Sequence, residues 1–376
     1  MRKSLVALAA AGLLATVSLT ACDDGAGASD SGDGDTAVAS GEKTSGKGGI
    51  GVILPDTKSS QRWKSADPRY LEAAFKAANV PYKIRNAEGD KEAFKRIGDE
   101  LLNGEVKVLI IANLDSASGK AVIDKAKARG VAVIDYDRLT LNGGADYYVS
   151  FDNEEVGRLQ GEHLATCLKQ KKKNGPPVVA ELNGSLTDNN ATLFKNGYDR
   201  ILQRKYDSAE YIKGPDQFVP DWDNDKGREI FAQMLKQFPN IDGVLAANDG
   251  LGNAAIEVLR EKNLNGQVPV TGQDATEQGL QNILVGDQCM TVYKPIKKEA
   301  DKAAELAIAL YNDVKPEIGA AKVKDPESGR NVPFASIPPI AITAKNIQKV
   351  VDDGYVAKDS LCAKQFKDDC QRAGIK

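Results

Sequence analysis

The chain has 376 residues, a formal net charge of -3, 41% hydrophobic residues and 6% aromatic residues, which is an ordinary composition for a globular protein. Nothing in this balance indicates a nucleic-acid surface, because the Lys-rich run at 169–173 is followed by Asn-Gly-Pro-Pro and is typical of a solvated helix end. We therefore expect no nucleic-acid partner.

The first 21 residues have the pattern of an export signal. A charged Met-Arg-Lys start precedes an apolar segment at 5–19 that is too short to span a bilayer comfortably, and small residues follow it. Leu19-Thr-Ala-Cys22 resembles the lipobox of bacterial lipoproteins, which implies that Cys22 is the lipid-bearing first residue of the mature chain. The alternative is an ordinary secretory signal with a coincidental cysteine. Lipidation would hold the protein on a membrane surface without a spanning helix.

Residues 22–49 are rich in Gly, Ser, Asp, Ala and Thr and cannot bury enough apolar surface to offset their ordering entropy, so we expect a disordered tether. Loss of Arg2 and Lys3 with the signal changes the net charge to -3 - 2 = -5. The remaining chain from Ile50 is longer than one hydrophobic core usually serves, so we expect two lobes.

From Ile50 onward, short apolar runs alternate with amphipathic helical patterns. We predict strands at Ile50–Leu54, Val106–Ala112, Val131–Tyr136, Val178–Leu182, Ile241–Ala247, Val268–Thr271 and Met290–Tyr293. A further apolar run lies in Asp146–Asn153. This alternation predicts an α/β fold with two doubly wound parallel sheets and right-handed crossovers.

Four cysteines remain when Cys22 is set aside: Cys167, Cys289, Cys362 and Cys370. Outside the cytoplasm an even number permits two disulfides with three possible pairings. Our first choice is Cys362 with Cys370, which leaves Cys167 with Cys289; the alternative is that some are buried free thiols. There is no CxxC and His163 is the only histidine, so we predict no metal site and no cofactor.

Polar side chains follow nearly every predicted strand. They lie in Asp56–Trp63, at Asn113, at Asp137-Arg138, at Asn183 with Asp188-Asn-Asn190, at Asn248-Asp249, at Gln273-Asp274 and at Lys294. In open parallel sheets, ligands bind just beyond the carboxyl ends of the strands. Carboxylates accept hydrogen bonds from sugar hydroxyls, Arg and Lys donate them, and amides do both.

The two tryptophans, Trp63 and Trp222, lie in polar loop sequence that offers no apolar pattern for them to join. We therefore predict that each stacks on an apolar sugar face, with core packing as the alternative.

Seven short blocks together resemble the periplasmic sugar-binding proteins of the xylose/multiple-sugar branch, which have the type I fold. The blocks are Pro55-Asp-Thr-Lys-Ser-Ser-Gln-Arg-Trp63, Tyr136-Asp-Arg138, Ser150-Phe-Asp-Asn-Glu154, Asp188-Asn-Asn190, Asn248-Asp249, Gly272-Gln-Asp274 and Met290-Thr-Val-Tyr-Lys-Pro295. Each block is weak, but the seven occur in the family's order. The resemblance implies two lobes joined by three crossing segments, with the ligand clamped between them.

The resemblance also implies which residues contact a sugar: Lys58, Arg62, Asp137, Arg138, Asp188, Asn190, Trp222, Asn248, Asp274 and Lys294. Arg138, beside Asp137, can give two parallel donors to a ring oxygen and a hydroxyl. The alternative for these two is an ordinary surface ion pair. The tail after Val350 matches no family feature, so its role stays open.

We predict one lobe from 50–149 and 295–335 and the other from 150–294 and 336–376. The implied function is the extracytoplasmic sugar-binding component of an ABC importer, with a monosaccharide such as xylose, a permease and its ATPase as partners. We expect a lipid-anchored monomer that is not an enzyme.

Three other functions compete with this one. A sugar sensor that presents its closed form to a membrane receptor is not separable from a transport protein by sequence. A sugar-modifying enzyme could use Asp137 and Asp188 as an acid/base pair, but Arg or Asn accompanies each acid and favours its ionised form. A transcriptional regulator of the same fold would need a helix-turn-helix where the export signal and tether stand.

Overall fold

The computed structural model describes residues 48–171 and 175–376. The predicted signal and Cys22 lie outside these residues, as does the predicted tether up to residue 47. Within the described ranges, no helix combines the length and the apolar character that crossing a bilayer requires.

A seven-stranded sheet forms what we call the first lobe, with the strand order β10-β11-β5-β4-β3-β1-β2. All neighbouring pairs are parallel except β10 with β11. The strands are β1 (Ile50–Leu54), β2 (Tyr82–Asn86), β3 (Val108–Ile111), β4 (Ala132–Tyr136), β5 (Tyr147–Phe151), β10 (Lys322–Lys324) and β11 (Asn331–Ile337).

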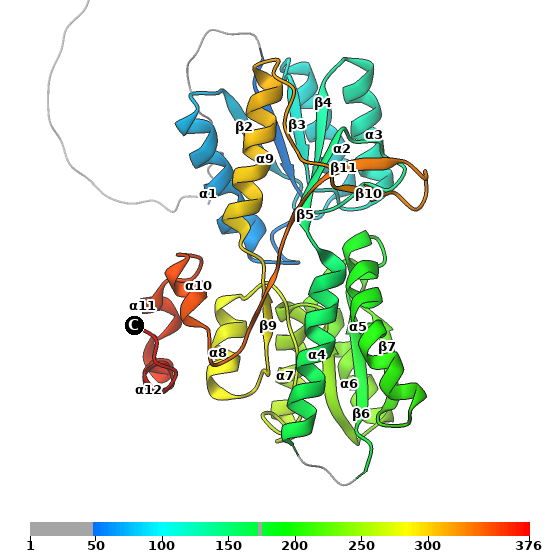
Figure 1. Cartoon of the computed structure of the whole chain (residues 1–376), viewed down its shortest axis with the longest axis vertical. Helices are drawn as coiled ribbons and strands as arrows, with labels where there is room; N and C mark the ends of the chain where they lie inside the picture. Colours follow the sequence, from blue (N-terminus) through cyan, green and yellow to red (C-terminus); the bar gives the residue numbers. More distant parts are fainter. Residues whose placement is uncertain (1–47, 172–174) are drawn as a thin grey trace, which may run out of the picture. The chain divides into compact units, whose positions relative to one another are not determined.

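Four helices cover the two faces of this sheet: α1 (Arg62–Ala77), α2 (Lys91–Asn103), α3 (Ser116–Ala128) and α9 (Ile296–Tyr311). Val52 and Leu54 pack with α1 and α9, which lie side by side in Figure 1, whereas Ile53 points to the opposite face and packs with α2 and α3. Alternate residues of one buried strand thus serve two cores, as expected for a doubly wound sheet.

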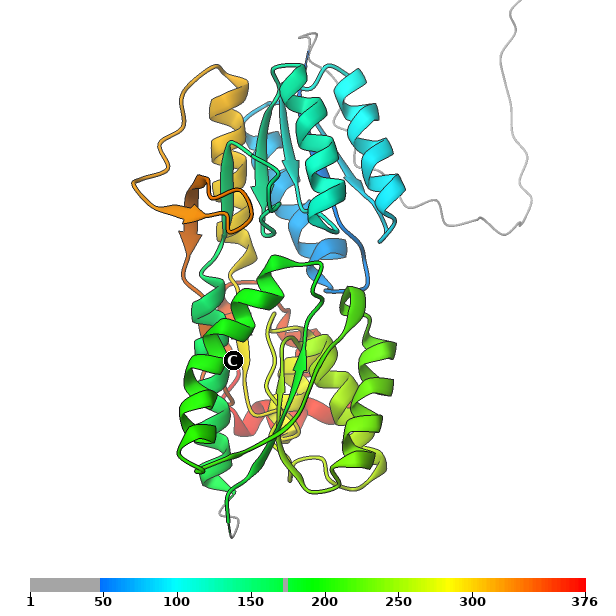
Figure 2. The ribbon, with the colours of Figure 1, turned by 90° about the vertical axis from the view of Figure 1, so that its right-hand side faces the viewer.

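The second lobe contains the parallel sheet β7-β6-β8 and the antiparallel pair β12-β9. The strands are β6 (Val178–Asn183), β7 (Ile212–Phe218), β8 (Ile241–Ala246), β9 (Thr291–Tyr293) and β12 (Ile340–Ile342). Its helices are α4 (Asn153–Gln170), α5 (Asn189–Asp207), the 3-10 turn η1 (Pro220–Trp222), α6 (Asn224–Gln237), α7 (Asp249–Glu261) and α8 (Glu277–Val285), which Figure 2 shows around β6 to β8 in green and yellow.

The predicted strand at Val268–Thr271 is wrong beyond a single bridge between Val270 and Val244. The hydroxyl of Thr271 accepts from the Ala246 N–H and donates to the Ala246 carbonyl, both at 3.0 Å. Two backbone hydrogen bonds, from the Val244 N–H to Pro269 and from the Thr271 N–H to Val244, make the bridge to β8, and the Thr271 side chain extends this pairing by one residue of β8.

The chain passes between the two lobes three times. It leaves β5 for α4 near Asp152, returns from β9 to α9 at Lys294 and Pro295, and leaves β11 for β12 at 338–339 (Figures 1 and 2). The predicted fold class, two doubly wound lobes with a three-segment hinge, is confirmed. The lobe limits predicted from the sequence stay predictions.

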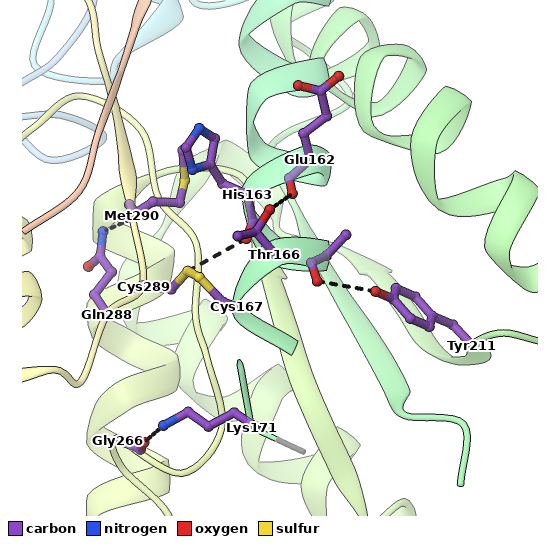
Figure 3. The surroundings of a disulfide bond; sticks show 11 residues. Glu162, His163, Thr166, Cys167, Lys171, Tyr211, Gly266, Gln288, Cys289 and Met290 are labelled. Atoms are coloured by element: carbon purple, nitrogen blue, oxygen red, sulfur yellow. Dashed lines mark hydrogen bonds between the residues drawn. A yellow bond between two sulfur atoms is a disulfide. The ribbon is translucent and has the colours of Figure 1, made fainter. Parts of the chain in front are cut away.

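The tail forms α10 (Gln348–Asp352), α11 (Lys358–Leu361), the 3-10 turn η2 (Lys364–Phe366) and α12 (Lys367–Arg372), and it packs on α8. A disulfide joins Cys362 to Cys370 within the tail, and a second joins Cys167 of α4 to Cys289 just before β9 (Figure 3). Both first-choice pairings are confirmed.

Candidate functional site

Ten of the eleven side chains predicted to bind a ligand line one small cavity of about 30 Å³ between the lobes. They are Arg62, Trp63, Asp137, Arg138, Asp188, Asn190, Trp222, Asn248, Asp274 and Lys294. The eleventh, Lys58, is exposed and lines two larger pockets that share residues with this cavity.

Asp137 marks the first lobe's side of the cavity, directly after β4. Its backbone has a left-handed φ of 62°, a conformation that costs free energy for a residue with a Cβ. The surroundings hold it there: its N–H donates to Val149 of β5 at 2.8 Å, and its carbonyl accepts from Ser150 Oγ at 2.8 Å and Tyr148 Oη at 2.9 Å. The carboxylate is thereby fixed at the end of the sheet.

Asp274 repeats this arrangement in the second lobe. Its φ is 104°, and its N–H donates to Val292 of β9 at 2.8 Å. In both lobes, therefore, a left-handed aspartate is tied by its backbone to the strand that enters the hinge. The Asp274 carboxylate crosses to the first lobe, where Ser60 Oγ donates to it at 2.8 Å.

Arg62 lies at the base of the cavity with its side chain only 1% exposed. Its Nη1 lies 2.7 Å from Asp137, its Nε and Nη2 bind Asp67 at 2.9 and 2.6 Å, and Nη2 also lies 2.5 Å from Glu299. Most of its donors are therefore used by carboxylates, so Arg62 positions Asp137 and retains one N–H of Nη1 for a ligand. The sequence motif showed Arg62 but gave no sign of Asp67 or Glu299 as its partners.

Charge controls how the buried acids ionise. Burial alone would raise the pKa of Asp137, but Lys294, Arg62 and Arg138 together lower it to about 2. Burial raises the pKa of Asp274, against the effect of Lys294, and raises that of Glu299 well above its ordinary value. Asp137 is consequently a fixed anion, whereas Asp274 holds its charge less strongly.

Helix caps position the second lobe's side chains. Asp188 caps α5 by accepting from the Asn190 N–H at 2.9 Å, and it also accepts from Trp222 Nε1 at 3.2 Å. Its Oδ2 lies 3.1 Å from Arg138 Nε, across the two lobes. Asn248 caps α7 through the Leu251 N–H, and its amide donates to the Ser59 carbonyl of the first lobe at 3.2 Å.

Both tryptophans line the cavity, and both are also buried in hydrophobic clusters, so the core packing given as the alternative is present. The Trp63 ring is 2% exposed and carries the Arg62 guanidinium 4.2 Å from its centroid. Trp222 meets Phe194 edge to face at 6.3 Å and fits because Gly184 has no side chain: a Cβ there would lie 2.0 Å from the ring. Whether either ring stacks on a ligand stays a prediction.

Sequence reasoning did not include four lining residues among the predicted contacts: Ser59, Ser60, Phe194 and Gln273. Ser59, Ser60 and Gln273 are next to predicted contact residues in the same short sequence motifs. Including the neighbours of each predicted residue would therefore have found these three. Phe194 lies within α5, where it is indistinguishable from a core position.

Several buried polar atoms at the cavity have no hydrogen-bond partner in the described part of the chain. Besides Arg138 Nε, which lies 3.1 Å from the Asp188 carboxylate, they are Trp63 Nε1, Gln273 Oε1 and Asp274 Oδ1, one donor and two acceptors. Such atoms are costly to bury unless something completes their bonding. A ligand with hydroxyl groups, each able to donate and accept, would suit all three.

Residues 50–314 match the family model of the periplasmic binding protein domain. The chain is 35% identical over 315 residues to a D-xylose-binding periplasmic protein of Haemophilus influenzae, covering 83% of this chain and 91% of the relative. It is 32% identical over 314 residues to the D-xylose-binding periplasmic protein of Escherichia coli, with 83% and 92% covered.

A solved structure is similar as well. The carbohydrate transporter solute-binding protein from Chloroflexus aurantiacus, in complex with D-glucose, superposes with a TM-score of 0.75 at 27% identity, covering 83% of this chain and 97% of that one.

Proposed function

This chain belongs to the periplasmic binding protein family, and from that premise we propose that it binds a monosaccharide between its lobes as the solute-binding component of an ABC sugar importer. The observation that supports this most is the convergence on one cavity of ten of the predicted side chains, which come from strand ends, turns and helix starts of both lobes. These groups supply donors, acceptors and two indole rings, which is what a sugar ring requires.

Binding requires the lobes to move. A cavity of about 30 Å³ holds roughly two water molecules. A sugar can therefore enter only after the cross-lobe contacts of Asp274 with Ser60 and of Asn248 with Ser59 have separated. On closing, sugar hydroxyls take the place of these contacts, and the three hinge segments accommodate the rotation.

We propose xylose or a similar aldose as the ligand, because the two relatives at 35% and 32% identity bear D-xylose in their names. The Chloroflexus aurantiacus structure holds D-glucose, which differs from xylose by one hydroxymethyl group. Discrimination between them depends on how the closed cavity fits that group.

The chemistry of the site supports binding without turnover. Asp137 is held ionised by three cations, so it is no proton donor for glycoside cleavage. The expectation that Asp188 is likewise held ionised is wrong in direction, because burial raises its pKa; its carboxylate is nevertheless already occupied by Arg138 and Trp222. The named relatives are likewise binding proteins. Delivery to a permease with its ATPase, export with lipid anchoring through Cys22, and a monomeric state complete the proposal.

Thermal unfolding against a panel of pentoses and hexoses tests this function. A sugar at a hundred times its Kd should stabilise the protein by about 2.7 kcal/mol. Arg138→Ala should abolish the shift, because it removes a buried donor that spans the lobes, whereas Arg129→Ala, at an exposed site on the first lobe, should retain it. No shift or titration heat with any monosaccharide would overturn the proposal.

A further inference from the structure

The C-terminal tail is fastened to the second lobe. Leu361, Cys370 and Ile375 are buried in one apolar cluster with Leu280 and Ile283 of α8. In addition, Ser360 Oγ donates to Glu277, and Gln281 Nε2 donates to the Leu361 carbonyl at 3.4 Å. The Cys362–Cys370 disulfide closes the tail on itself. The tail should therefore move with the second lobe when the hinge opens.

Tyr355 of this tail lies where the two lobes meet. Its ring packs against the tail cluster of the second lobe and also against the first-lobe core that includes Trp63 and Ala66 of α1. Its centroid is 5.4 Å from that of Tyr293, the last residue of β9 before the hinge crossing at Lys294. One tail side chain thus contacts both lobes beside the hinge.

Tyr355 also lines a pocket of about 630 Å³ that adjoins the candidate site. Its walls come from the start of α1, from α7 and α8, and from the tail at Gly354–Ala357. Ser60 and Asp274, which bind each other across the lobes, are also part of its lining. Tyr355 is therefore close to the contacts that a sugar would rearrange.

We propose that Tyr355 is a closed-state latch: held on the second lobe by the tail, it packs against α1 of the first lobe when the lobes close and so strengthens sugar binding. The proposal rests on the proposed function and assigns a role to the tail. When the lobes rotate apart, the contact with α1 is lost, whereas the contact with Tyr293 remains within the second lobe.

A contact made only in the closed state shifts the open–closed equilibrium toward the form that holds the sugar. An aromatic contact of this kind corresponds to a change in Kd of about threefold to tenfold.

The test is isothermal titration of the full chain with its best sugar. Tyr355→Ala should raise the Kd about threefold to tenfold, and Tyr355→Phe, which keeps the ring, should stay within about twofold of the parent. The matched control is Tyr311→Ala, because Tyr311 packs against the same first-lobe core from the end of α9. It should lower the melting temperature and leave the Kd unchanged.

Small-angle X-ray scattering gives a second readout, the radius of gyration, which should not change if Tyr355 only stabilises the fold. Without sugar, Tyr355→Ala should have a larger radius of gyration than the parent, and saturating sugar should remove the difference. If Tyr355→Ala does not fold, Tyr355→Leu replaces it in both measurements.

A parent-like Kd and radius of gyration for the Ala or Leu variant would overturn the latch while leaving sugar binding intact. Failure of the parent itself to bind any sugar would instead overturn the proposed function, so the two failures are distinguishable.

Discussion

The two lobes present the same kind of aspartate to the cavity but secure it in different ways. Asp137 and Asp274 both have a left-handed φ, and each donates its N–H to the strand that leads into the hinge. Around Asp137 stand Arg62, Lys294 and Arg138, which together outweigh its burial, whereas Lys294, at 3.6 Å, and Arg62 act on Asp274 without outweighing its burial. The first lobe's half of the site is thus electrostatically complete, whereas the second lobe's half is not.

The lobes also differ in how their folds are held. The first lobe buries an ion cluster beneath its half of the site, in which Arg62 pairs with Asp67, Glu299 and Asp137. The second lobe contains both disulfides. This difference indicates that ion pairs hold the first lobe's half of the site in place, whereas covalent links stabilise the second lobe. Polar atoms without a hydrogen-bond partner remain in both halves, Trp63 Nε1 in the first and Gln273 Oε1 with Asp274 Oδ1 in the second.

The strongest test of this comparison is Arg62→Met. It removes the cation that pairs with three buried carboxylates, so the free energy of unfolding should fall by about 3–5 kcal/mol, as measured by urea denaturation. Arg69→Met, an exposed position on the same helix, is the control and should cost far less. If the two variants are equally stable, the ion cluster does not secure the first lobe.

Removal of the Cys167–Cys289 disulfide by paired Cys→Ser changes tests the second lobe. The bond spans 122 residues of sequence and should contribute about 3 kcal/mol to stability, more than the Cys362–Cys370 bond, which spans 8. Sugar affinity should not change. A larger loss from the shorter bridge would contradict this ranking, which urea denaturation can measure directly.

Asp274→Asn separates affinity from stability. Loss of a charged hydrogen-bond acceptor should cost about 2 kcal/mol of binding, roughly a thirtyfold rise in Kd by titration calorimetry. The unliganded stability should hardly change, because burial already disfavours this charge. Asp137→Asn should lower both the sugar affinity and the unliganded stability. An equal loss of stability in the two variants would contradict the proposed difference between the lobes.

The last prediction is a pH dependence of stability from Asp249, which is fully buried at the start of α7. Burial, with the nearby Asp274, raises the pKa of Asp249 from 3.8 to about 7. An acid with a raised pKa stabilises the folded state when protonated; this contribution is complete below about pH 4 and is lost as the pH rises to about 7.

Relative to the parent, Asp249→Asn should therefore gain up to about 1.4 kcal/mol of stability per pH unit as the pH rises from 5 to 7. Urea denaturation at several pH values measures this difference. The substitution also changes the hydrogen bonds that Thr276, Gln288 and Thr291 donate to Asp249. Because this change acts at every pH, it adds a constant to the stability difference between variant and parent and does not make that difference depend on pH. A constant difference would refute the prediction.

The fold was largely predictable because buried parallel strands have continuous apolar sequence. β1 was located to the residue, and β4, β6 and β8 to within one residue. The strands β2, β7, β10, β11 and β12 were missed. Of these, β2 and β7 are rich in polar residues and lie at sheet edges. Edge strands need only one paired neighbour, so they do not require that apolar pattern.

The sequence by itself indicated most of the polar side chains that gather at the cavity, because residues just after parallel strands must emerge at the same edge of a sheet. Only the tertiary structure decided how those residues are held. Arg62 and Glu299 are 237 positions apart, and Ser60 and Asp274 are 214 apart. Such pairings depend on helix placement and lobe closure, which arise from packing of the whole chain and leave no local pattern in the sequence.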